Sequence, residues 1–299
     1  MTTTRSDSTF EEELNQPLPL GRTLFSWGMT ALAFIFTGLA LLPLLAILLK
    51  IIGQGLPQLN WEVLVSLPAP VGMKGVPNGF ANAIAGTLIL VGIASLISIP
   101  FGVMTGILLS EFGNKSAIAS AIRFITLILS SVPSIVVGVF AYAVIVLVTK
   151  KFSALAGGFA LGVLMLPVIA LTTEEALKLV PTSVRLASAA LGGSRFQTTF
   201  RIVVVSALPA ITTGILLAVA RAAGETAPLL LTAMASTPNW PSGLFSPTPA
   251  LSALIYNYSQ SAYPEQQKLA WTASLVLLGM VLLIGIISRL VTKRRLKIH

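Results

Sequence analysis

The chain of 299 residues contains no cysteine, and its only histidine, His299, is the last residue. These absences exclude disulfides, iron–sulfur clusters, cysteine nucleophiles, Ser–His catalysis and imidazole metal sites. Charged residues are also scarce, at 10% of the chain against about 25% in soluble proteins. Hydrophobic residues make up 55%, and the mean hydropathy is +0.90. Because so little polar surface cannot cover a water-soluble globule, the composition indicates an all-α, polytopic membrane protein.

Six apolar stretches are long enough to cross about 30 Å of hydrocarbon as helices, which takes about 20 residues. They are Leu24–Ile52, Asn82–Ser110, Ala121–Val148, Leu155–Leu171, Ala207–Met234 and Leu269–Leu290. No small-residue cleavage site follows the first stretch, so we expect it to remain as a spanning helix. The expected organisation is therefore a cytoplasmic tail (1–23), a first helix (24–52), an extracytoplasmic loop (53–81), a transmembrane domain with five helices (82–291) and a basic tail (292–299).

The distribution of Lys and Arg predicts the orientation, since cytoplasmic loops collect basic residues. With both termini in the cytoplasm, thirteen of the 19 basic residues lie inside, and Arg221 lies within a span. The five outside are Lys50, Lys74, Lys150, Lys151 and Lys268. This orientation places the polar stretch 172–206 inside and the segment 235–268 outside. It also accounts for the net charge of +9, so we expect no nucleic-acid partner.

The inner stretch 172–206 has the pattern of two short helices. Thr173 stands at the expected cap of the first helix, where the carboxylates that follow it suit the helix dipole. Pro181 separates this helix from a second one through Leu186–Leu191, which Gly192 ends. Two short helices at an angle can present a compact knob to a partner, and the alternative is an ordinary amphipathic connection.

Arg221 and Glu225 fall inside the fifth predicted span. Arg221 lies fourteen residues into it, about 21 Å along a helix at about 1.5 Å per residue. A charge at that depth costs about 2.5–3.5 kcal/mol on insertion scales, and the i,i+4 spacing predicts that the two side chains pair on one helical face. The pair either fixes helix packing or forms an anion path, in which Thr226 would offer a hydroxyl.

Two other charges lie near the inner ends of spans. We expect Glu111 to be a solvated interfacial charge and Arg123 to anchor the third span at the inner surface. The spacings Gly102–Gly106 and Gly158–Gly162 allow helix backbones to approach closely, although 24 glycines produce such spacings often by chance.

Three stretches resemble the permease subunits of phosphate-specific ABC importers: SSVPSIVVGVFAY (130–142), TTEEALKLVPTSVRLASAALGGSRFQT (172–198) and ALPAITTGILLAVARAAGETAPLLLTA (207–233). The EAA loop of such permeases is matched at Ala187, Gly192 and Ile202. Leu186 stands in place of its glutamate, Ser188 in place of its third alanine and Val204–Val205 in place of its Leu-Pro. The run G-E-T-A-P is similar to the PstA type of subunit, and the resemblance extends from about Asn82 to the C-terminus.

The resemblance implies a MetI-like, type I importer bundle in the bacterial inner membrane, with inorganic phosphate as substrate. The implied partners are a PstC-like second permease, PstB-like ATPase subunits and a PstS-like phosphate-binding protein outside. The residues expected to couple to the ATPase are Glu174, Glu175, Ala187, Ser188, Gly192 and Arg195. No G-x-x-x-x-G-K-[ST] loop is present, so we expect ATP and Mg on the partner ATPase, with no enzyme activity, cofactor or metal in this chain.

Three alternatives remain open at this stage. A permease for sulfate or molybdate, or the companion phosphate permease, would share the importer pattern. A secondary transporter or channel would share the hydropathy and would work without an ATPase. A membrane-embedded enzyme would need a convergent set of catalytic groups, which ten acids, no cysteine and a terminal histidine do not indicate.

Overall fold

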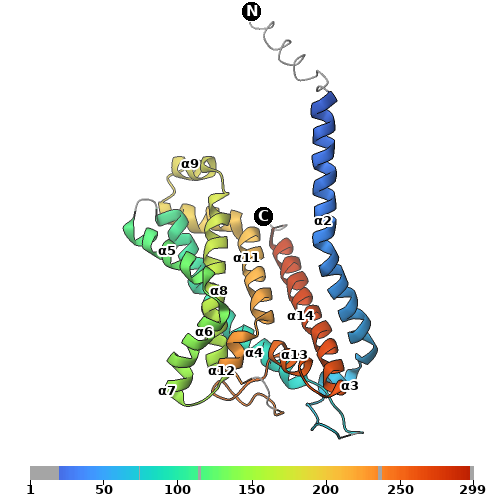
Figure 1. The fold of residues 1–299 in the computed structure, drawn as a ribbon. Coiled ribbons are helices and arrows are strands. Elements are labelled where there is room, and N and C mark those ends of the chain that lie inside the picture. Colours follow the sequence, from blue (N-terminus) through green and yellow to red (C-terminus); the bar gives the residue numbers. More distant parts are fainter. Residues whose placement is uncertain (1–19, 74, 114–115, 235–237, 297–299) are drawn as a thin grey trace, which may run out of the picture. The chain divides into compact units, whose positions relative to one another are not determined.

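The computed structural model describes residues 20–73, 75–113, 116–234 and 238–296, and within these ranges it is helical without strands (Figure 1). The chain divides into two compact units, Met1–Lys50 and Ile51–His299. Five helices among the described residues are long and apolar enough to cross a membrane, and a bent helix pair supplies a sixth crossing if it is one span. The all-α membrane prediction is therefore confirmed, and the five or six candidate spans agree with the six predicted.

The first predicted span is a single helix, α2 (Leu20–Gly55), which is longer than the predicted Leu24–Ile52. Pro43 lies inside it, as is tolerated in membrane helices. The helix ends within the larger unit, where the Thr272 hydroxyl donates a hydrogen bond to the Gly55 carbonyl over 3.2 Å. A side chain at Gly55 would come within 2.8 Å of the Trp271 carbonyl oxygen, so this end of α2 packs closely on the last helix.

The predicted outer loop 53–81 is partly folded. A 3₁₀ turn, η1 (Leu56–Gln58), precedes the short helix α3 (Trp61–Val65), whose first turn is capped by the side chain of Asn60. Phe80 is fully buried, and its N–H donates to the Val63 carbonyl. These contacts fold the loop against the N-terminal end of the next helix, so it is more than a plain connection.

The centre of the larger unit is the pair α4 (Ala81–Ile107) and α8 (Ala154–Lys178), which cross with small residues between them. A Cβ atom at Gly102 would lie 2.8 Å from Ile169, one at Gly106 2.6 Å from Thr173, and one at Gly158 2.5 Å from Ile93. Both G-x-x-x-G spacings therefore lie in this interface, where the missing side chains allow the backbones to touch.

The third predicted span is broken. It consists of α5 (Ala117–Ser131) followed by α6 (Ser134–Ala141), with a bend of 105° between this first half and the second half ending at Thr149. Pro133 explains the break, because proline forces the preceding Val132 into an extended conformation. The π-helical turn η3 (Tyr142–Val146) and α7 (Leu147–Thr149) complete the second half. The prediction of one continuous helix over Ala121–Val148 was wrong.

The stretch 172–206, which we predict to lie inside, is organised differently from the prediction. Helix α8 continues to Lys178, so Thr173 is a buried interior residue and not a helix cap. After Pro181 the short helix α9 (Thr182–Ala190) follows, and it ends at Gly192, whose φ is +80°. A capping box then starts α10 (Arg195–Gln197), which continues through the π-helical turn η4 (Thr198–Val203) into α11 (Val204–Gly224).

The fifth predicted span also breaks. Helix α11 stops at Gly224, Glu225 is extended with φ −69° and ψ 129°, and α12 (Ala227–Thr232) begins after Thr226. A continuous helix over Ala207–Met234 was therefore a wrong prediction. Its two parts still belong to one core, since buried residues of α11 and α12 pack together with those of α4 and α8.

The segment 235–268 contains a helix, α13 (Leu251–Ser259), whose first four residues are buried. Its first N–H, from Leu251, donates to the Thr87 hydroxyl of α4 over 2.9 Å, which anchors α13 against the central pair. The last helix, α14 (Pro264–Leu296), begins before the predicted Leu269–Leu290 and packs on α13 and α11.

Candidate functional site

The predicted pair of Arg221 and Glu225 lies at the end of α11. Arg221 occupies the last helical turn, and its Nε atom lies 3.5 Å from Oε1 of Glu225. The Arg221 side chain is 59% exposed, and that of Glu225 is 17% exposed. The expectation that both share one helical face was wrong, because Glu225 follows the end of the helix. The two charges do form an ion pair, which spans a break in an apolar segment.

Hydrogen bonds hold the backbone of this break in place. The Ser252 hydroxyl from α13 donates to the Glu225 carbonyl over 2.8 Å. The carbonyl of Thr226 accepts from the N–H groups of Leu229 and Leu230 in α12. A pocket of about 360 Å³ opens beside the break; its lining comprises Gly224, Thr226, Ser252, Ile255, Ser274, Leu277, Leu278 and Val281. Thr226 thus lines a cavity next to the ion pair, with hydroxyl groups on an otherwise apolar wall.

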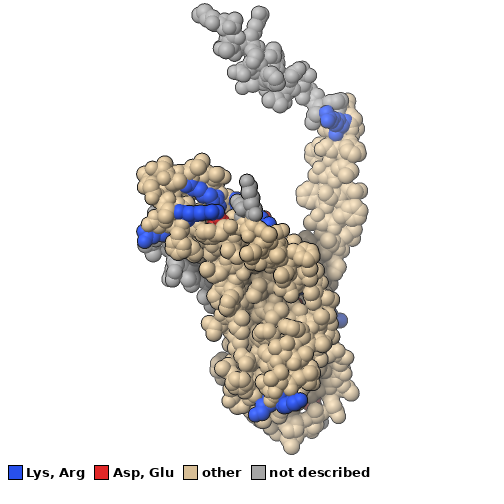
Figure 2. Space-filling view, turned by 90° about the vertical axis from the view of Figure 1, so that its left-hand side faces the viewer, with Lys and Arg blue, Asp and Glu red and all other residues tan. Residues whose placement is uncertain are grey.

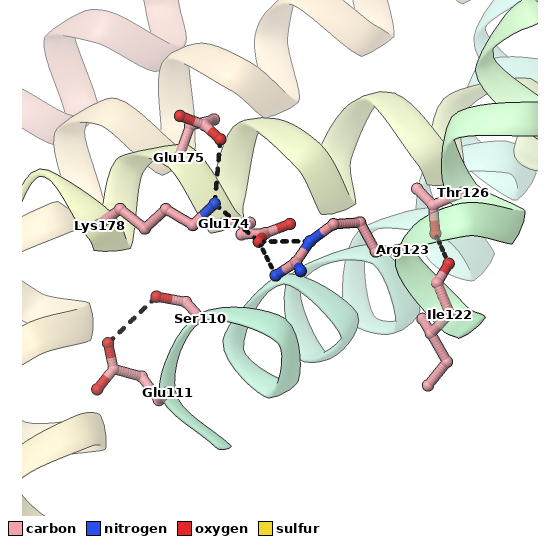
Figure 3. Close-up of polar contacts among 8 residues, drawn as sticks. All are labelled: Ser110, Glu111, Ile122, Arg123, Thr126, Glu174, Glu175 and Lys178. Carbon is pink, nitrogen blue, oxygen red and sulfur yellow. Dashed lines mark hydrogen bonds and ion pairs between the residues drawn. The ribbon is translucent and has the colours of Figure 1, made fainter. Parts of the chain in front are cut away.

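A second charged cluster lies near the C-terminal end of α8 and centres on Glu174 (Figure 3). The Glu174 carboxylate is 1% exposed, accepts from Nε of Arg123 over 3.0 Å, and pairs with Nζ of Lys178 over 2.9 Å. Glu175 lies on a different side of the helix in Figure 3, is 73% exposed, and pairs with the same Lys178 over 3.3 Å. Glu174 therefore faces helix α5 inside the protein, whereas Glu175 faces the surface. Of these two predicted coupling residues, only Glu175 can meet a partner directly.

Helix α9 forms a projecting knob next to this cluster (Figure 1). Ala187 is exposed on it, and Leu191 is 91% exposed just after its end. Ser188, in contrast, is buried and shares a 2.7 Å hydrogen bond with Thr198 of η4. A Cβ atom added at Gly192 would meet no atom within 4 Å, so this position is open to the surroundings. The knob thus presents small and apolar groups, as a docking element would.

Basic residues surround the knob. Figure 2 shows Lys and Arg side chains gathered at the α9 end of the larger unit, and a smaller group at its opposite end. Arg195, a predicted coupling residue, lies in α10 with its guanidinium 5.2 Å from the centre of the Phe112 ring. Its side chain is exposed at the base of the knob.

The ion pairs of Glu174 and Glu175 were not predicted, and neither was one between Glu111 and Arg185. Glu111, expected to be solvated, is only 9% exposed and pairs with Nη2 of Arg185 in α9 over 2.7 Å. The expectation of a solvated charge was wrong, because α9 folds over the end of α4. The sequence signal was a lone acid at the inner end of a span together with an arginine in the inner segment. Within the described ranges no group of three or more acidic or histidine side chains gathers closely enough to hold a metal ion.

Known proteins resemble this chain over most of its length. The family "Binding-protein-dependent transport system inner membrane component" matches residues 98–297. The "Phosphate transport system permease protein PstA" of Yersinia pestis is 40% identical over 252 residues, which are 84% of each chain. The protein of the same name from Haemophilus influenzae is 39% identical over 88% of this chain and 92% of its own length. The "Probable phosphate transport system permease protein PstA" of Methanocaldococcus jannaschii is 37% identical over the same shares.

Solved structures share the fold at low sequence identity. A chain of the MetNI methionine ABC transporter in an inward-facing conformation has a TM-score of 0.60 at 21% identity, with 72% of this chain and 94% of that chain covered. A chain of a bacterial alginate ABC transporter also has a TM-score of 0.60, at 14% identity, with 92% and 97% covered. The fold is thus that of an ABC importer permease. The chain belongs to the family of binding-protein-dependent transport system inner membrane components, and within it to the group of the PstA permease proteins.

Proposed function

We propose that this chain is a membrane-spanning permease subunit of an ATP-driven importer of inorganic phosphate. The observation that carries the proposal is the likeness, at 36–40% identity over most of the chain, to permeases named for phosphate transport in bacteria. The arrangement of Arg221 and Glu225 supports it chemically. An arginine in an apolar segment, at a helix break beside a cavity, suits a path for an anion.

Arg221 has donors to offer to an anion. Its Nε atom lies near Glu225, and its two terminal nitrogens make no hydrogen bond to any residue that the structure describes. The planar guanidinium can donate two parallel hydrogen bonds to phosphate oxygens, which a lysine ammonium cannot do. Glu225 would hold the guanidinium in place. The passing anion would then replace Glu225 as the partner of Arg221. Thr226, at the edge of the cavity, would add a hydroxyl contact.

The energy in this proposal comes from a partner. The chain carries no phosphate-cradling P-loop, so ATPase subunits would bind and hydrolyse ATP, and this chain itself would catalyse no reaction. The exposed knob of α9, with Ala187 and Leu191 at its surface, would enter a groove on an ATPase subunit. Glu175 and Arg195 flank the knob and would contact the rim of that groove.

The other partners follow from the family. A second permease subunit, of the PstC kind, would complete the translocation path. A phosphate-binding protein would dock on the opposite side, over the loop 53–81 and the segment 235–268. Both termini and the knob of α9 would lie in the cytoplasm, since most basic residues are then inside. ATP binding would close the ATPase subunits, displace α9 and open the path outward.

Uptake by the reconstituted complex tests the proposal. Proteoliposomes that contain both permeases and the ATPase subunits, with the binding protein outside and ATP inside, should accumulate labelled phosphate. Unlabelled phosphate should compete with it, while sulfate and molybdate should not. Accumulation without ATP would indicate a secondary transporter, and competition by sulfate or molybdate in place of phosphate would indicate another oxyanion importer. Either outcome would refute the proposed function.

A further inference from the structure

The inner end of α4 is joined to the knob by a two-point ion pair. Helix α4 finishes in a π-helical turn, η2 (Leu108–Phe112), which carries Glu111. Nη2 of Arg185 lies 2.7 Å from Oε1 of Glu111, and Nε lies 3.4 Å from Oε2. The Arg185 side chain is 25% exposed and that of Glu111 is 9% exposed. Partial burial weakens screening by water, so this pair is a stronger contact than an exposed one.

The same arginine also holds the end of α8. Nη2 of Arg185 donates to the Leu177 carbonyl over 2.9 Å, and Nη1 donates to the Val180 carbonyl. Leu177 is in the last turn of α8 and Val180 follows the end of the helix, where a positive charge suits the helix dipole. A single side chain of α9 thus contacts the ends of both central helices.

A second arginine contacts the same turn from the other side of the knob. Nη2 of Arg195 donates to the backbone carbonyl of Glu111. Arg185 precedes the turn at Gly192–Gly193 and Arg195 follows it, so η2 is held at two points of the inner segment. Between α9 and η2 lies a cavity of about 550 Å³, which both arginines help to line. Val184 of α9 also packs against the buried cluster that includes Ile107 of α4 and Leu177 of α8. On the side of the open cavity, however, polar bridges join the knob to η2.

The helices beyond these contacts are closely packed. Gly102 and Gly106 of α4 touch Ile169 and Thr173 of α8, so a displacement of the inner ends passes along both helices together. Glu174 of α8 in turn holds α5 through Arg123. The contact at Glu111 therefore lies between the knob and a rigid central pair.

We propose that Glu111 and Arg185 are positioning residues that make α9 move as one body with the inner ends of α4 and α8. The inference rests on the proposed function for the force on α9, which an ATPase subunit would supply. Without the pair, α9 would still dock, because its exposed groups are unchanged. Helix α9 would then move relative to η2 by changing the width of the cavity between them, and α4 would not follow.

The distance between α9 and η2 in different nucleotide states tests this directly. The chain has no cysteine, so spin labels can be attached to Ser183→Cys on α9 and Leu108→Cys on η2, in a complex whose other subunits have no accessible cysteine. We expect a narrow distance distribution that does not change between nucleotide-free and ATP-trapped states. In Glu111→Gln the distribution should broaden and shift with nucleotide. A shift in the complex without the Glu111 substitution would overturn the proposal, as would an unchanged distribution in Glu111→Gln.

A double-mutant cycle gives an independent readout. In Glu111→Gln and in Arg185→Gln we expect normal co-purification of ATPase subunits and a loss of about fivefold or more in substrate transported per ATP hydrolysed. The double variant should lose no more than either single variant, because both remove the same contact. The matched control is Arg201→Gln on η4, since Arg201 is exposed and makes no ion pair with any described residue. Additive losses, or an equal loss in the control, would refute the pair's role.

The proposed function and the positioning role of Glu111 and Arg185 can be refuted independently of each other. If the complex transported another oxyanion, the proposed function would be wrong, yet the label distances would still report whether α9 and α4 move together. If phosphate transport were confirmed and the distance between the labels changed with nucleotide, only the positioning role would be lost.

Discussion

Arg221 and Glu225 form an ion pair across the end of α11, with Nε and Oε1 3.5 Å apart and the arginine side chain 59% exposed. At 3.5 Å, with the arginine side chain largely uncovered by the rest of the chain, the pair is a loose contact. It can therefore open at small cost when another anion reaches the guanidinium. The break after Gly224 places the pair at a helix end and not within a packed helix face, which argues against a purely structural role.

Substitution of Arg221 by lysine tests whether the guanidinium serves the anion. Arg221→Lys keeps the charge but loses the planar fork. We expect normal assembly and a loss of about tenfold or more in phosphate uptake, the size of about 1.4 kcal/mol in binding. Glu225→Gln should also assemble, with a milder defect, since it only positions Arg221. Labelled uptake and subunit levels are measured together.

The double variant separates a path residue from a packing pair. A purely structural pair would be partly rescued in Arg221→Met, Glu225→Gln, since the main cost arises from one unpaired buried ion. A path residue would not be rescued, because the anion has then lost its ligand. Recovery of phosphate uptake in this double variant, at normal subunit levels, would refute the anion-path role.

The positions of the membrane helices could be predicted from the sequence because an apolar run of about 20 residues suffices to define them. The breaks could not be located in the same way. The helices are interrupted at Val132–Pro133 and at Gly224–Thr226, but the sequence around each break remains mostly apolar. Hydropathy therefore predicts one continuous helix across each of them. Pro133 was visible, but proline is tolerated in membrane helices, as Pro43 in α2 shows.

The charged contacts depended on the tertiary structure. Glu111 and Arg185 are 74 residues apart, and nothing local indicates that α9 folds over the end of α4. The extension of α8 to Lys178 likewise turned Glu174 inward, although its position after Thr173 suggested an exposed first turn. By contrast, the glycine that ends α9 was predictable, because glycine favours the left-handed conformation found at Gly192.

The interface between α4 and α8 makes a further prediction about stability. A Cβ at Gly106 would lie 2.6 Å from Thr173 Cβ and 2.7 Å from the Ala170 carbonyl oxygen, so Gly106→Ala must push the helices apart. We expect a loss of about 1–3 kcal/mol in the free energy of unfolding. The matched control is Gly92→Ala in the same helix, which meets no atom within 4 Å and should be neutral or slightly stabilising.

Unfolding of the two variants in detergent, followed by helical signal against denaturant, provides the measurement. Equal midpoints for Gly106→Ala and Gly92→Ala would contradict the close packing of α4 on α8. If only Gly106→Ala lowers the denaturant midpoint of unfolding, the lost stability comes from the clash with Thr173 and Ala170. The replacement of glycine by alanine as such would then not be the cause.

The turn after α9 predicts which substitutions the knob tolerates. Gly192 has a φ of +80°, its N–H donates to the Ala189 carbonyl, and the N–H of Gly193 donates to the Ser188 carbonyl, which is the Schellman arrangement at a helix end. Asn adopts this conformation at small cost, whereas a β-branched residue does not. Gly192→Val should therefore lower both ATPase co-purification and uptake, and Gly192→Asn should keep most of both. Normal values in Gly192→Val would refute a docking role for this turn.

The orientation of the chain gives the last prediction. Both termini and α9 should be cytoplasmic, because thirteen of the 19 basic residues then lie inside and five lie outside. Two of these five, Lys150 and Lys151, are adjacent in one short turn. Ser194 caps α10 and is exposed on the α9 side, while Ser242 is exposed in the segment 235–268. With no cysteine in the chain, single variants can be labelled without background. An impermeant thiol reagent added to intact cells should label Ser242→Cys and leave Ser194→Cys unlabelled until the membrane is opened. The reverse pattern would place the basic end of the protein outside, and α9 could then not reach a cytoplasmic ATPase.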